Sequence, residues 1–163
     1  MKFPVIGEKY NPGDWKLYAS HTEKEIKGFF GEFRFLSNFH VCHVVFENIL
    51  FPSSEAAYMA AKTKDMGLRE RFVLTNPKES KKLGRSIALR PNWDNLRLDV
   101  MFLIVYDKFY RNADIRQKLL KTGDKYLEET NHWKDMFYGV DYYSEIGENN
   151  LGKILMRVRS LFQ

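Results

Sequence analysis

Two hydrophobic patterns follow each other in the first half of this chain, and they predict a β-hairpin followed by helices. Val41 to Phe46 and Ile49 to Phe51 are rich in β-branched and aromatic residues, with Glu47-Asn48 between them. Such paired runs predict two antiparallel strands, although Glu-Asn is not a pair that strongly favours a type I′ turn. Pro52 is expected to end the second strand.

Helix starts and ends are marked in the next segment. Ser53 is expected to cap a helix that runs to about Lys62, because a serine side chain accepts hydrogen bonds from the first amides. Asn76-Pro77-Lys78-Glu79 combines an amide cap, a proline at the first helical position and an acid at the third. This combination predicts a second, short helix, which Gly84 is expected to end.

Three further helices are predicted in the second half. Asp94 is expected to open the first of them, and an apolar stripe at helical spacing predicts its buried face: Leu98, Met101, Phe102, Val105 and Phe109. The next helix is expected from Asp114 to Thr122, before Gly123, and residues 126–130 look like a short strand. The last helix is expected to start after Asn149 or Asn150 and to bury Leu151, Ile154, Leu155, Val158 and Leu161.

The order of these elements predicts the fold class. Helices dominate, and the strands do not alternate regularly with them, which argues against a doubly wound sheet. We predict an α+β fold, a single mainly helical domain with a small antiparallel β element near its N-terminal part. The chain has 163 residues, which fits one domain. Residues 1–27 are less patterned, so we expect an N-terminal extension packed on a domain of residues 28–163.

Amino-acid composition limits which cellular compartments and which binding partners we expect for this chain. Cys42 is the one cysteine, so the chain can form no intramolecular disulfide, and we expect a reducing, cytoplasmic location. We find no leader pattern and no apolar run of about 20 residues, so we expect neither secretion nor a membrane span. The formal charge is +5, but residues 62–90 alone carry nine bases against three acids. That stretch is either a solvated helical face or a surface for phosphate or nucleic acid.

Glu55 is the first candidate for chemistry. It lies in the first turn of a predicted helix, where a carboxylate interacts favourably with the helix dipole and needs no further role. Alternatively, Glu55, Met59 and Lys62 share one face of a helix whose alanines indicate close packing. A partly desolvated carboxylate in that position suits acid–base work.

Three other segments combine polar groups with aromatic rings or a helix start. Ser37 and Asn38 lie between Phe35 and Phe39, as a turn or as the wall of a base pocket. The loop of residues 132–139 holds a carboxylate among aromatic rings, a composition typical of ligand pockets; its candidates are Trp133, Asp135 and Tyr138. The segment before the last helix is either an ordinary cap or an anion site; its candidates are Asn149, Asn150 and Gly152.

Several classes of site are not indicated. The four histidines show no metal-ligand spacing and Cys42 has no cysteine partner, so we expect no zinc site and no other metal. There is no glycine-rich P-loop and no dinucleotide fingerprint, so no cofactor is predicted.

The motifs, taken in order, resemble those of one family. They are FLSNF, FPSSEAAYMAAK, the segment Lys82 to Arg85, the helix with Trp93, Arg97 and Met101, the segment Lys121 to Asp124, NHWKDMFYG and NNLGKILMRVR. Together they are similar to the NADAR family, also called YbiA-like or DUF1768, over about residues 29–162. The resemblance implies an N-glycosidase that hydrolyses ribosyl–nitrogen bonds. Its substrates would be phosphoribosylamino-pyrimidine intermediates of riboflavin synthesis, or ADP-ribose attached to guanine, including guanine in nucleic acid.

The resemblance also assigns roles to residues. By motif, the family's acids match Glu55 and Asp135, and its further positions match Lys62, Gly84, Arg85, Asn150 and Gly152. Tyr138 stands where the family usually has tryptophan, which affects the expected substrate preference. A ribosyl–nitrogen bond breaks with oxocarbenium character, which carboxylates stabilise. Lys62 and Arg85 would then hold phosphate, and Trp133 with Tyr138 would stack on the base.

The rival hypothesis is a non-catalytic module that binds ADP-ribose, another nucleotide or nucleic acid. The basic stretch supports it, but that stretch lacks the interleaved aromatic residues of a single-strand groove. A purely structural protein is the third alternative, and the polar aromatic loops argue against it.

Overall fold

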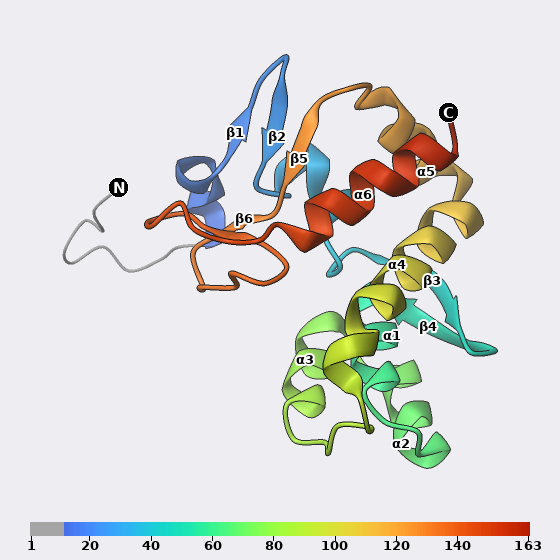
Figure 1. The fold of residues 1–163 in the computed structure, drawn as a ribbon. Helices are drawn as coiled ribbons and strands as arrows, with labels where there is room; N and C mark the ends of the chain where they lie inside the picture. The colour runs from blue at the N-terminus through green and yellow to red at the C-terminus, as the bar shows by residue number, and fades with distance from the viewer. Residues whose placement is uncertain (1–11) are drawn as a thin grey trace. The chain divides into compact units, whose positions relative to one another are not determined.

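The computed structural model describes residues 12–163 (Figure 1). The chain divides into two compact units, which are described here one at a time. The central unit comprises residues 38–121, and the described part of the terminal unit comprises residues 12–37 and 122–163. The α+β class predicted from the sequence is confirmed.

The predicted hairpin forms the β element of the central unit. Strands β3 (Val41–Phe46) and β4 (Ile49–Ser53) are antiparallel. Both turn residues are left-handed, with φ of 45° at Glu47 and 66° at Asn48, so the turn has type I′ character despite its weak signal. Pro52 does not end the strand as predicted, because it lies opposite a bulge between Val41 and Val44 where the register shifts. A bulge tolerates a residue that cannot donate a ladder hydrogen bond.

The turn is held by two arginines from the basic stretch. Glu47 forms an ion pair with Arg69, whose guanidinium is buried and also donates from Nε to the carbonyl of Thr63 at 2.7 Å. The carboxylate of Glu47 lies 3.8 Å from Nη1 of Arg90. Part of the positive charge of residues 62–90 is therefore neutralised inside the unit.

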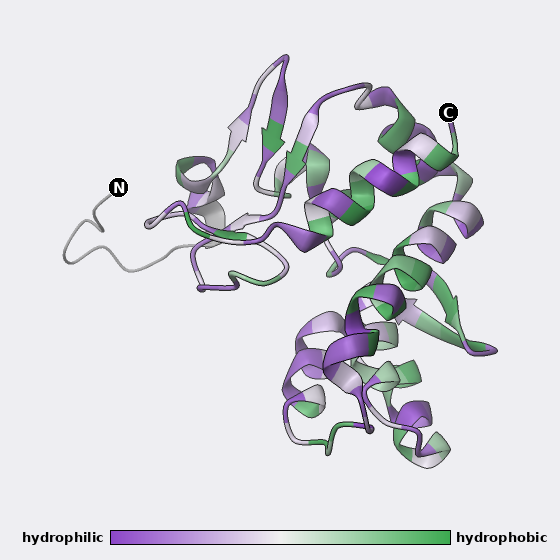
Figure 2. Cartoon of the chain, in the orientation of Figure 1, coloured by the Kyte–Doolittle hydropathy of each residue, from purple (hydrophilic) through white to green (hydrophobic). Residues whose placement is uncertain are grey.

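Five helices complete the central unit. They are α1 (Ser54–Ala61), α2 (Met66–Arg71) with the 3-10 turn η3 (Phe72–Leu74), α3 (Pro77–Gly84), α4 (Trp93–Arg111) and α5 (Ala113–Lys121). The predicted caps are confirmed: Ser53 Oγ accepts from the amide of Ala56 at 3.0 Å, and Asn76 and Glu79 form a capping box. Helix α2 was not predicted. Figure 2 shows a mostly hydrophobic hairpin and a largely hydrophilic α3.

The buried stripe of α4 differs from the predicted one by part of a turn. Met101, Val105 and Phe109 are buried as predicted, but Leu98 is 40% exposed and Phe102 is only half-buried. The stripe is completed by Val100, Ile104 and the buried Lys108. The reason is that α4 packs on β3, so neighbouring positions along one face are buried.

The side chain of Asp107 ties α4 to the hairpin. Its Oδ2 accepts from the amide of Val45 in β3 at 2.6 Å. Arg111, one turn further along the helix, holds the same carboxylate through Nε at 3.0 Å and Nη2 at 2.8 Å. These hydrogen bonds hold the hairpin against α4, the helix on which β3 packs.

The terminal unit contains two small sheets. Strands β1 (Ser20–His21) and β2 (Glu25–Lys27) are antiparallel, and β2 pairs in parallel with β5 (Tyr126–Glu128). Strands β6 (Thr130–Asn131) and β7 (Val140–Asp141) form a second parallel pair. The strand predicted over residues 126–130 is therefore split between β5 in the first sheet and β6 in the second. We predicted only antiparallel pairing, whereas each of these two sheets contains a parallel pair. The 3-10 turns η1 (Pro12–Tyr18) and η2 (Gly31–Leu36) precede and follow the first two strands.

Helix α6 (Asn150–Leu161) packs on β5. A side chain at Gly152 would place its Cβ 2.2 Å from the carbonyl oxygen of Leu127, so only glycine allows this approach. The predicted buried face is partly confirmed: Leu151, Leu155 and Val158 are buried, Ile154 is half-buried, and Leu161 is 56% exposed. Arg159 is buried instead and donates to Thr122 Oγ1 at 2.8 Å and to the carbonyl of Lys125 at 2.9 Å. Within residues 12–163, none of the helices is long and apolar enough to span a bilayer.

Candidate active site

Glu55 lies at the buried start of α1. Glu55 is only 7% exposed, and its backbone amide donates to the carbonyl of Asn38 at 3.1 Å. The structure thus brings together two predicted site residues that are far apart in the sequence. A carboxylate in the first turn of a helix interacts favourably with the helix dipole, and burial keeps competing water away from it.

Asn38 supplies an unused acceptor next to this helix start. The residue is 7% exposed, and its Nδ2 approaches Sδ of Met101 at 3.4 Å. Its Oδ1 is buried and accepts no hydrogen bond from any residue that the structure describes. A buried acceptor without a donor carries a free-energy cost, and a ligand N–H or O–H group would remove it. Ser37, the neighbouring prediction, is buried at the end of η2, where its amide donates to Arg34.

Lys62 follows α1 on the same face as Glu55. Burial lowers the pKa of the Lys62 ammonium below its ordinary value, and the positive charges of Arg85 and Lys81 lower it further, while the negative charge of Glu55 opposes both. Its Nζ lies 5.7 Å from the centre of the Tyr58 ring. Lys62 therefore interacts electrostatically with the buried Glu55 carboxylate and with two further cations, an arrangement suited to an anionic ligand.

Gly84 explains how these cations come together. A Cβ at Gly84 would lie 2.3 Å from Sδ of Met59, so glycine lets the end of α3 pack closely on α1. This packing brings Lys81 and the exposed Arg85, in the last turn and at the cap of α3, near the end of α1. The role visible for Gly84 is thus close packing, and its predicted contact with substrate stays a prediction. Lys81 was not singled out from the sequence, although it belonged to the basic stretch.

Asp135 is embedded in the loop between β6 and β7 of the terminal unit. Its Oδ1 accepts from the amides of Phe137 at 3.2 Å and Tyr138 at 2.9 Å. The residue is half-buried, and its Oδ2 accepts no hydrogen bond among residues 12–163. One carboxylate oxygen therefore shapes the loop, and the catalytic role expected for Asp135 stays a prediction.

Asn131 is the residue that organises this loop, and the sequence did not reveal it. It is fully buried, and its Nδ2 donates to the carbonyl of Asp135 at 2.8 Å. The same group reaches the carbonyls of Val140 at 3.3 Å and Glu129 at 3.4 Å. Asn131 opens the NHWKDMFYG motif, but the motif gave no role to an asparagine whose partners are backbone groups of the loop.

The aromatic residues of the loop differ in exposure. Trp133 is 45% exposed and lies edge-on to His132 at 4.9 Å and to Phe30 at 6.5 Å. Tyr138 is half-buried and lies edge-on to Phe137 at 4.8 Å. Burial lowers the pKa of His132 below its ordinary value of 6.5. Trp133 offers a broad face at the surface, as a base-stacking residue requires.

Two backbone amides at the start of α6 already have acceptors within the terminal unit. The amide of Asn150 donates to the carbonyl of Phe137 at 3.4 Å, and that of Leu151 donates to Tyr138 at 3.0 Å. These groups bind the preceding loop and are not available to a phosphate. Two amides of this helix start therefore serve a contact between helix and loop, and the anion site, one of the two alternatives for this segment, stays a prediction.

Asn149 has a structural task at the same helix start. It is buried and left-handed, with φ of 52°. Its Oδ1 accepts from the amide of Glu129 at 3.1 Å, and its Nδ2 donates to Leu127 at 2.9 Å and to the hydroxyl of Tyr126 at 3.1 Å. All groups of this side chain are used within the unit, and the substrate contacts predicted for Asn149, Asn150 and Gly152 remain predictions.

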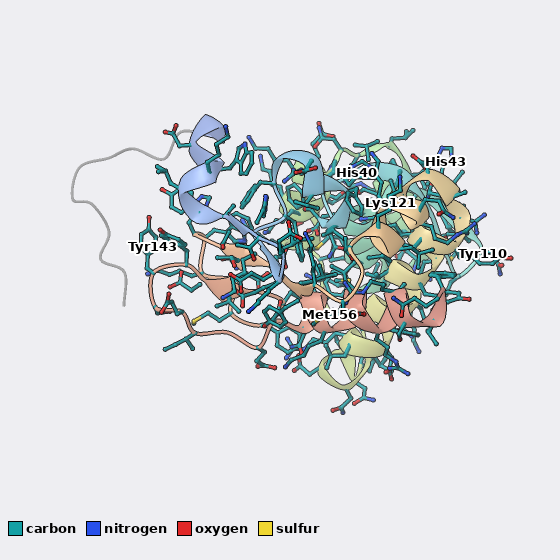
Figure 3. The ribbon with its side chains drawn as sticks, turned by 90° about the horizontal axis from the view of Figure 1, so that it is seen from above. His40, His43, Tyr110, Lys121, Tyr143 and Met156 are labelled. Carbon is teal, nitrogen blue, oxygen red and sulfur yellow. The ribbon has the colours of Figure 1, made fainter. Side chains whose placement is uncertain are left out.

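The described part of the chain shows no set of side chains that could bind a metal ion. Residues 12–163 contain no group of three His, Cys, Asp or Glu side chains placed to hold a metal ion. Cys42, His40 and His43 lie close along the chain at the start of β3, and the two histidines are labelled in Figure 3. Burial raises the pKa of the Cys42 thiol, which disfavours the reactive thiolate.

The chain is similar to several known proteins. The chain is 38% identical over 132 residues to a riboflavin biosynthesis protein of Vibrio vulnificus, covering 79% of this chain and 35% of that protein. It is 36% identical over 129 residues to an N-glycosidase of Nostoc punctiforme, covering 76% and 81%. It is 31% identical over 134 residues to the N-glycosidase YbiA of Escherichia coli, covering 80% of each.

The fold has a solved counterpart. The NMR structure of the Escherichia coli protein YbiA matches with a TM-score of 0.76 at 27% identity, covering 90% of this chain and 89% of that one. The model of the NADAR domain matches residues 18–163, nearly all of the described part. This chain therefore belongs to the NADAR domain family.

Proposed function

We propose that this protein is an N-glycosidase that hydrolyses the bond between a phosphorylated ribose and a nitrogen atom. The observation that carries the proposal is the buried Glu55 at the start of α1, with Lys62 on the same helix face and Lys81 and Arg85 acting on that lysine. Relatives named N-glycosidase cover most of the chain, which supports the same reaction class.

In the proposed reaction, the ribosyl–nitrogen bond breaks as positive charge develops on the ribose. Glu55 stabilises that charge and directs water to the anomeric carbon. The water oxygen forms the new bond to that carbon as the carbon–nitrogen bond breaks. One water proton stays on the new hydroxyl, and the other passes to the Glu55 carboxylate and from it to the departing nitrogen. Lys62 and Arg85 hold the phosphate, and the acceptor Oδ1 of Asn38 receives a donor from the substrate.

Glu55→Gln tests the assignment because it preserves shape and removes charge. We expect activity to fall by about 10²-fold or more, the scale of a lost proton-transfer group, with an unchanged melting temperature. Glu70→Gln, at an exposed position of α2, is the matched control and should keep full activity. Wild-type turnover by a folded Glu55→Gln protein would exclude Glu55 as the catalytic group.

Two substrate classes fit the proposed site. A phosphoribosylamino-pyrimidine presents one phosphate, and ADP-ribosylated guanine presents a pyrophosphate. A relative named for riboflavin biosynthesis supports the first class, and the name N-glycosidase gives the reaction without a substrate. Incubation with each compound, followed by mass spectrometry of the released base, separates the two; release from neither would refute the proposed reaction.

The exposed bases around α2 and α3 favour one alternative, a module that binds nucleic acid without catalysis. These bases are Lys64, Arg71, Lys78, Lys82 and Arg85. Many phosphate contacts predict a steep loss of affinity with salt, and one small ligand predicts a shallow loss. A salt titration with a short oligonucleotide distinguishes them.

A further inference from the structure

The terminal unit has a partly open cavity that the proposed reaction does not use. Its volume is about 390 Å³, within the usual range for small-molecule sites. It is bordered by β1, β2, β5, β6 and β7 and by the end of η1, and its lining includes Tyr18, Lys27, Glu128, Asp141, Tyr142 and Glu145.

Two of the lining carboxylates are buried. Asp141 is 5% exposed and Glu128 is 8% exposed. Burying a carboxylate costs free energy unless a cation or hydrogen bonds compensate it. Neither carboxylate forms an ion pair with any residue in the described range 12–163. The lining contains one lysine, Lys27, whose Nζ pairs instead with Oε2 of Glu25 at 3.6 Å.

Asp141 is the clearer example of a buried carboxylate with an unsatisfied oxygen. Its Oδ2 accepts from the amide and the hydroxyl of Ser144, each at 2.8 Å. Its Oδ1 is buried and accepts no hydrogen bond from the described residues. Glu128 is better satisfied, since its Oε1 accepts from Thr130 Oγ1 at 2.7 Å. The cavity therefore has one acceptor in need of a donor and a second carboxylate beside it.

The lining indicates the chemistry of that donor. It carries three carboxylates against one ammonium group, in a chain whose overall charge is +5. Tyr18 and Tyr142 lie edge-on at 5.1 Å on the same lining and supply aromatic surface. Tyr143 packs edge-on against Tyr142 at 5.3 Å and lies in the segment between β7 and α6 (Figure 3). Carboxylates with aromatic rings suit an organic cation with N–H donors.

We propose that this cavity is a binding site for a small organic cation, a primary ammonium or guanidinium compound held by the carboxylates of Asp141 and Glu128. The cation would donate to Oδ1 of Asp141 and rest its apolar part against Tyr18 and Tyr142. The site needs no catalytic step and is independent of the proposed hydrolysis.

Four matched probes test the charge requirement: n-butylamine, ethylguanidine, neutral 1-butanol and anionic butyrate. Titration of the full chain at low salt, followed by ligand-observed NMR, should show saturable binding of the two cations with dissociation constants on the order of 1 mM or below. The alcohol and butyrate should bind at least about tenfold more weakly. Absence of saturation by either cation below about 10 mM, or equal binding of the alcohol, would overturn the proposal.

Asp141→Asn separates a binding role from a structural one. The amide oxygen can still accept from Ser144, while the donor-seeking Oδ1 is replaced. We expect cation binding to weaken at least about tenfold, with a melting temperature equal to or above that of the wild type, because an uncompensated buried charge is removed. A lower melting temperature with unchanged binding would show that Asp141 is purely structural and refute the site.

Two further variants complete the test. Glu128→Gln should also weaken the cation, and Glu23→Gln, at an exposed position between β1 and β2, should not. Glu55→Gln should bind the cation with wild-type affinity whether or not it retains hydrolysis, so failure of this proposal is distinguishable from failure of the proposed function. Equal affinity in the Glu128→Gln and Glu23→Gln proteins would remove Glu128 from the site.

Discussion

Asn131 holds both backbone groups of Asp135. Its Oδ1 accepts from the amide of Asp135 at 2.9 Å, and its Nδ2 donates to the carbonyl of the same residue at 2.8 Å. A fully buried side chain thus closes the loop that carries a predicted catalytic carboxylate. The position of that carboxylate depends on a residue with no part in the chemistry.

The first prediction concerns this pair. Asn131→Asp keeps the acceptor but removes the donor shared by three carbonyl oxygens, and it adds a buried charge. We expect a loss of about 1–3 kcal/mol in unfolding free energy, the cost of unsatisfied buried polar groups. Urea denaturation measures it. Asn95→Asp, at an exposed position in α4, is the control; equal effects of the two substitutions would contradict the structural role of Asn131.

The hairpin turn provides the second prediction. Glu47→Gln removes the negative partner of the buried Arg69 and should destabilise the protein by about 1–3 kcal/mol, because a buried cation loses a charged hydrogen-bond partner. Asn48→Gly keeps the ion pair and supplies a residue suited to the φ of 66°. We expect its midpoint of denaturation to be unchanged or raised. A stabilising Glu47→Gln would mean that the cost of desolvating the charged pair outweighs its attraction.

These residues also show what the sequence could reveal. The caps at Ser53 and Asn76 were predictable because the cap, the proline and the acid act within one turn of chain. The turn type at Glu47-Asn48 was not, because its ion pairs come from arginines 22 and 43 residues away. Local hydrogen bonds leave a local pattern, and distant charges do not.

The candidate active site and the proposed cation site show the same contrast between local and distant interactions. Glu55 and Lys62 were identified because helical spacing places them on one face, and the family resemblance, now confirmed, marked them. Asn131 and Asp141 were missed because their importance arises from pairing of β6 with β7, two strands of two residues each. Strands of that length have no readable alternation. The amides of Asn150 and Leu151 donate to carbonyls of a loop 13 residues earlier, a contact that left no pattern in the sequence.

The third prediction concerns phosphate. If Lys62 and Arg85 hold it, replacing either with alanine should weaken a phosphorylated substrate at least about tenfold, but should weaken its dephosphorylated analogue little. Lys82→Ala, at an exposed position of α3, controls for general charge. Steady-state kinetics on both substrates give the comparison. An equal loss on both would mean that the two side chains act structurally.

The fourth prediction concerns pH. Because burial lowers the pKa of Lys62 below 10.5, the folded state releases this proton at lower pH than the unfolded state. Charged Lys62 therefore opposes folding below its folded pKa, and that cost disappears as pH rises towards 10.5. Lys62→Met should be at least as stable as the wild type near neutral pH, with the difference shrinking at higher pH.

Melting temperatures of the wild type and Lys62→Met between about pH 7 and pH 10 measure this effect. Lys78→Met, at an exposed position of α3, controls for loss of one positive charge. If Lys62→Met instead destabilises most near neutral pH, then the attraction of Glu55 outweighs burial and the repulsion of Arg85 and Lys81. That outcome would identify the Glu55–Lys62 pair as a source of stability.

The last prediction concerns the loop of residues 132–139, where the two kinds of predicted site residue should fail differently. Trp133 is 45% exposed, so Trp133→Ala should change stability little and weaken binding by about 1–3 kcal/mol, the contribution of stacking on a base. Asp135→Asn keeps an oxygen that can accept from Phe137 and Tyr138, so the loop should stay folded. It removes the charge, so turnover of bound substrate should fall while binding is retained.

Asp135→Ala separates the two tasks of this carboxylate. It removes the acceptor of both amides along with the charge, and it should lower the melting temperature where Asp135→Asn does not. Calorimetry and single-turnover kinetics on the three variants give independent readouts. If Asp135→Asn turns over at the wild-type rate while Asp135→Ala unfolds more easily, the carboxylate serves only the loop. If Trp133→Ala lowers the melting temperature but not the affinity per folded molecule, Trp133 is a packing residue and no part of the base site.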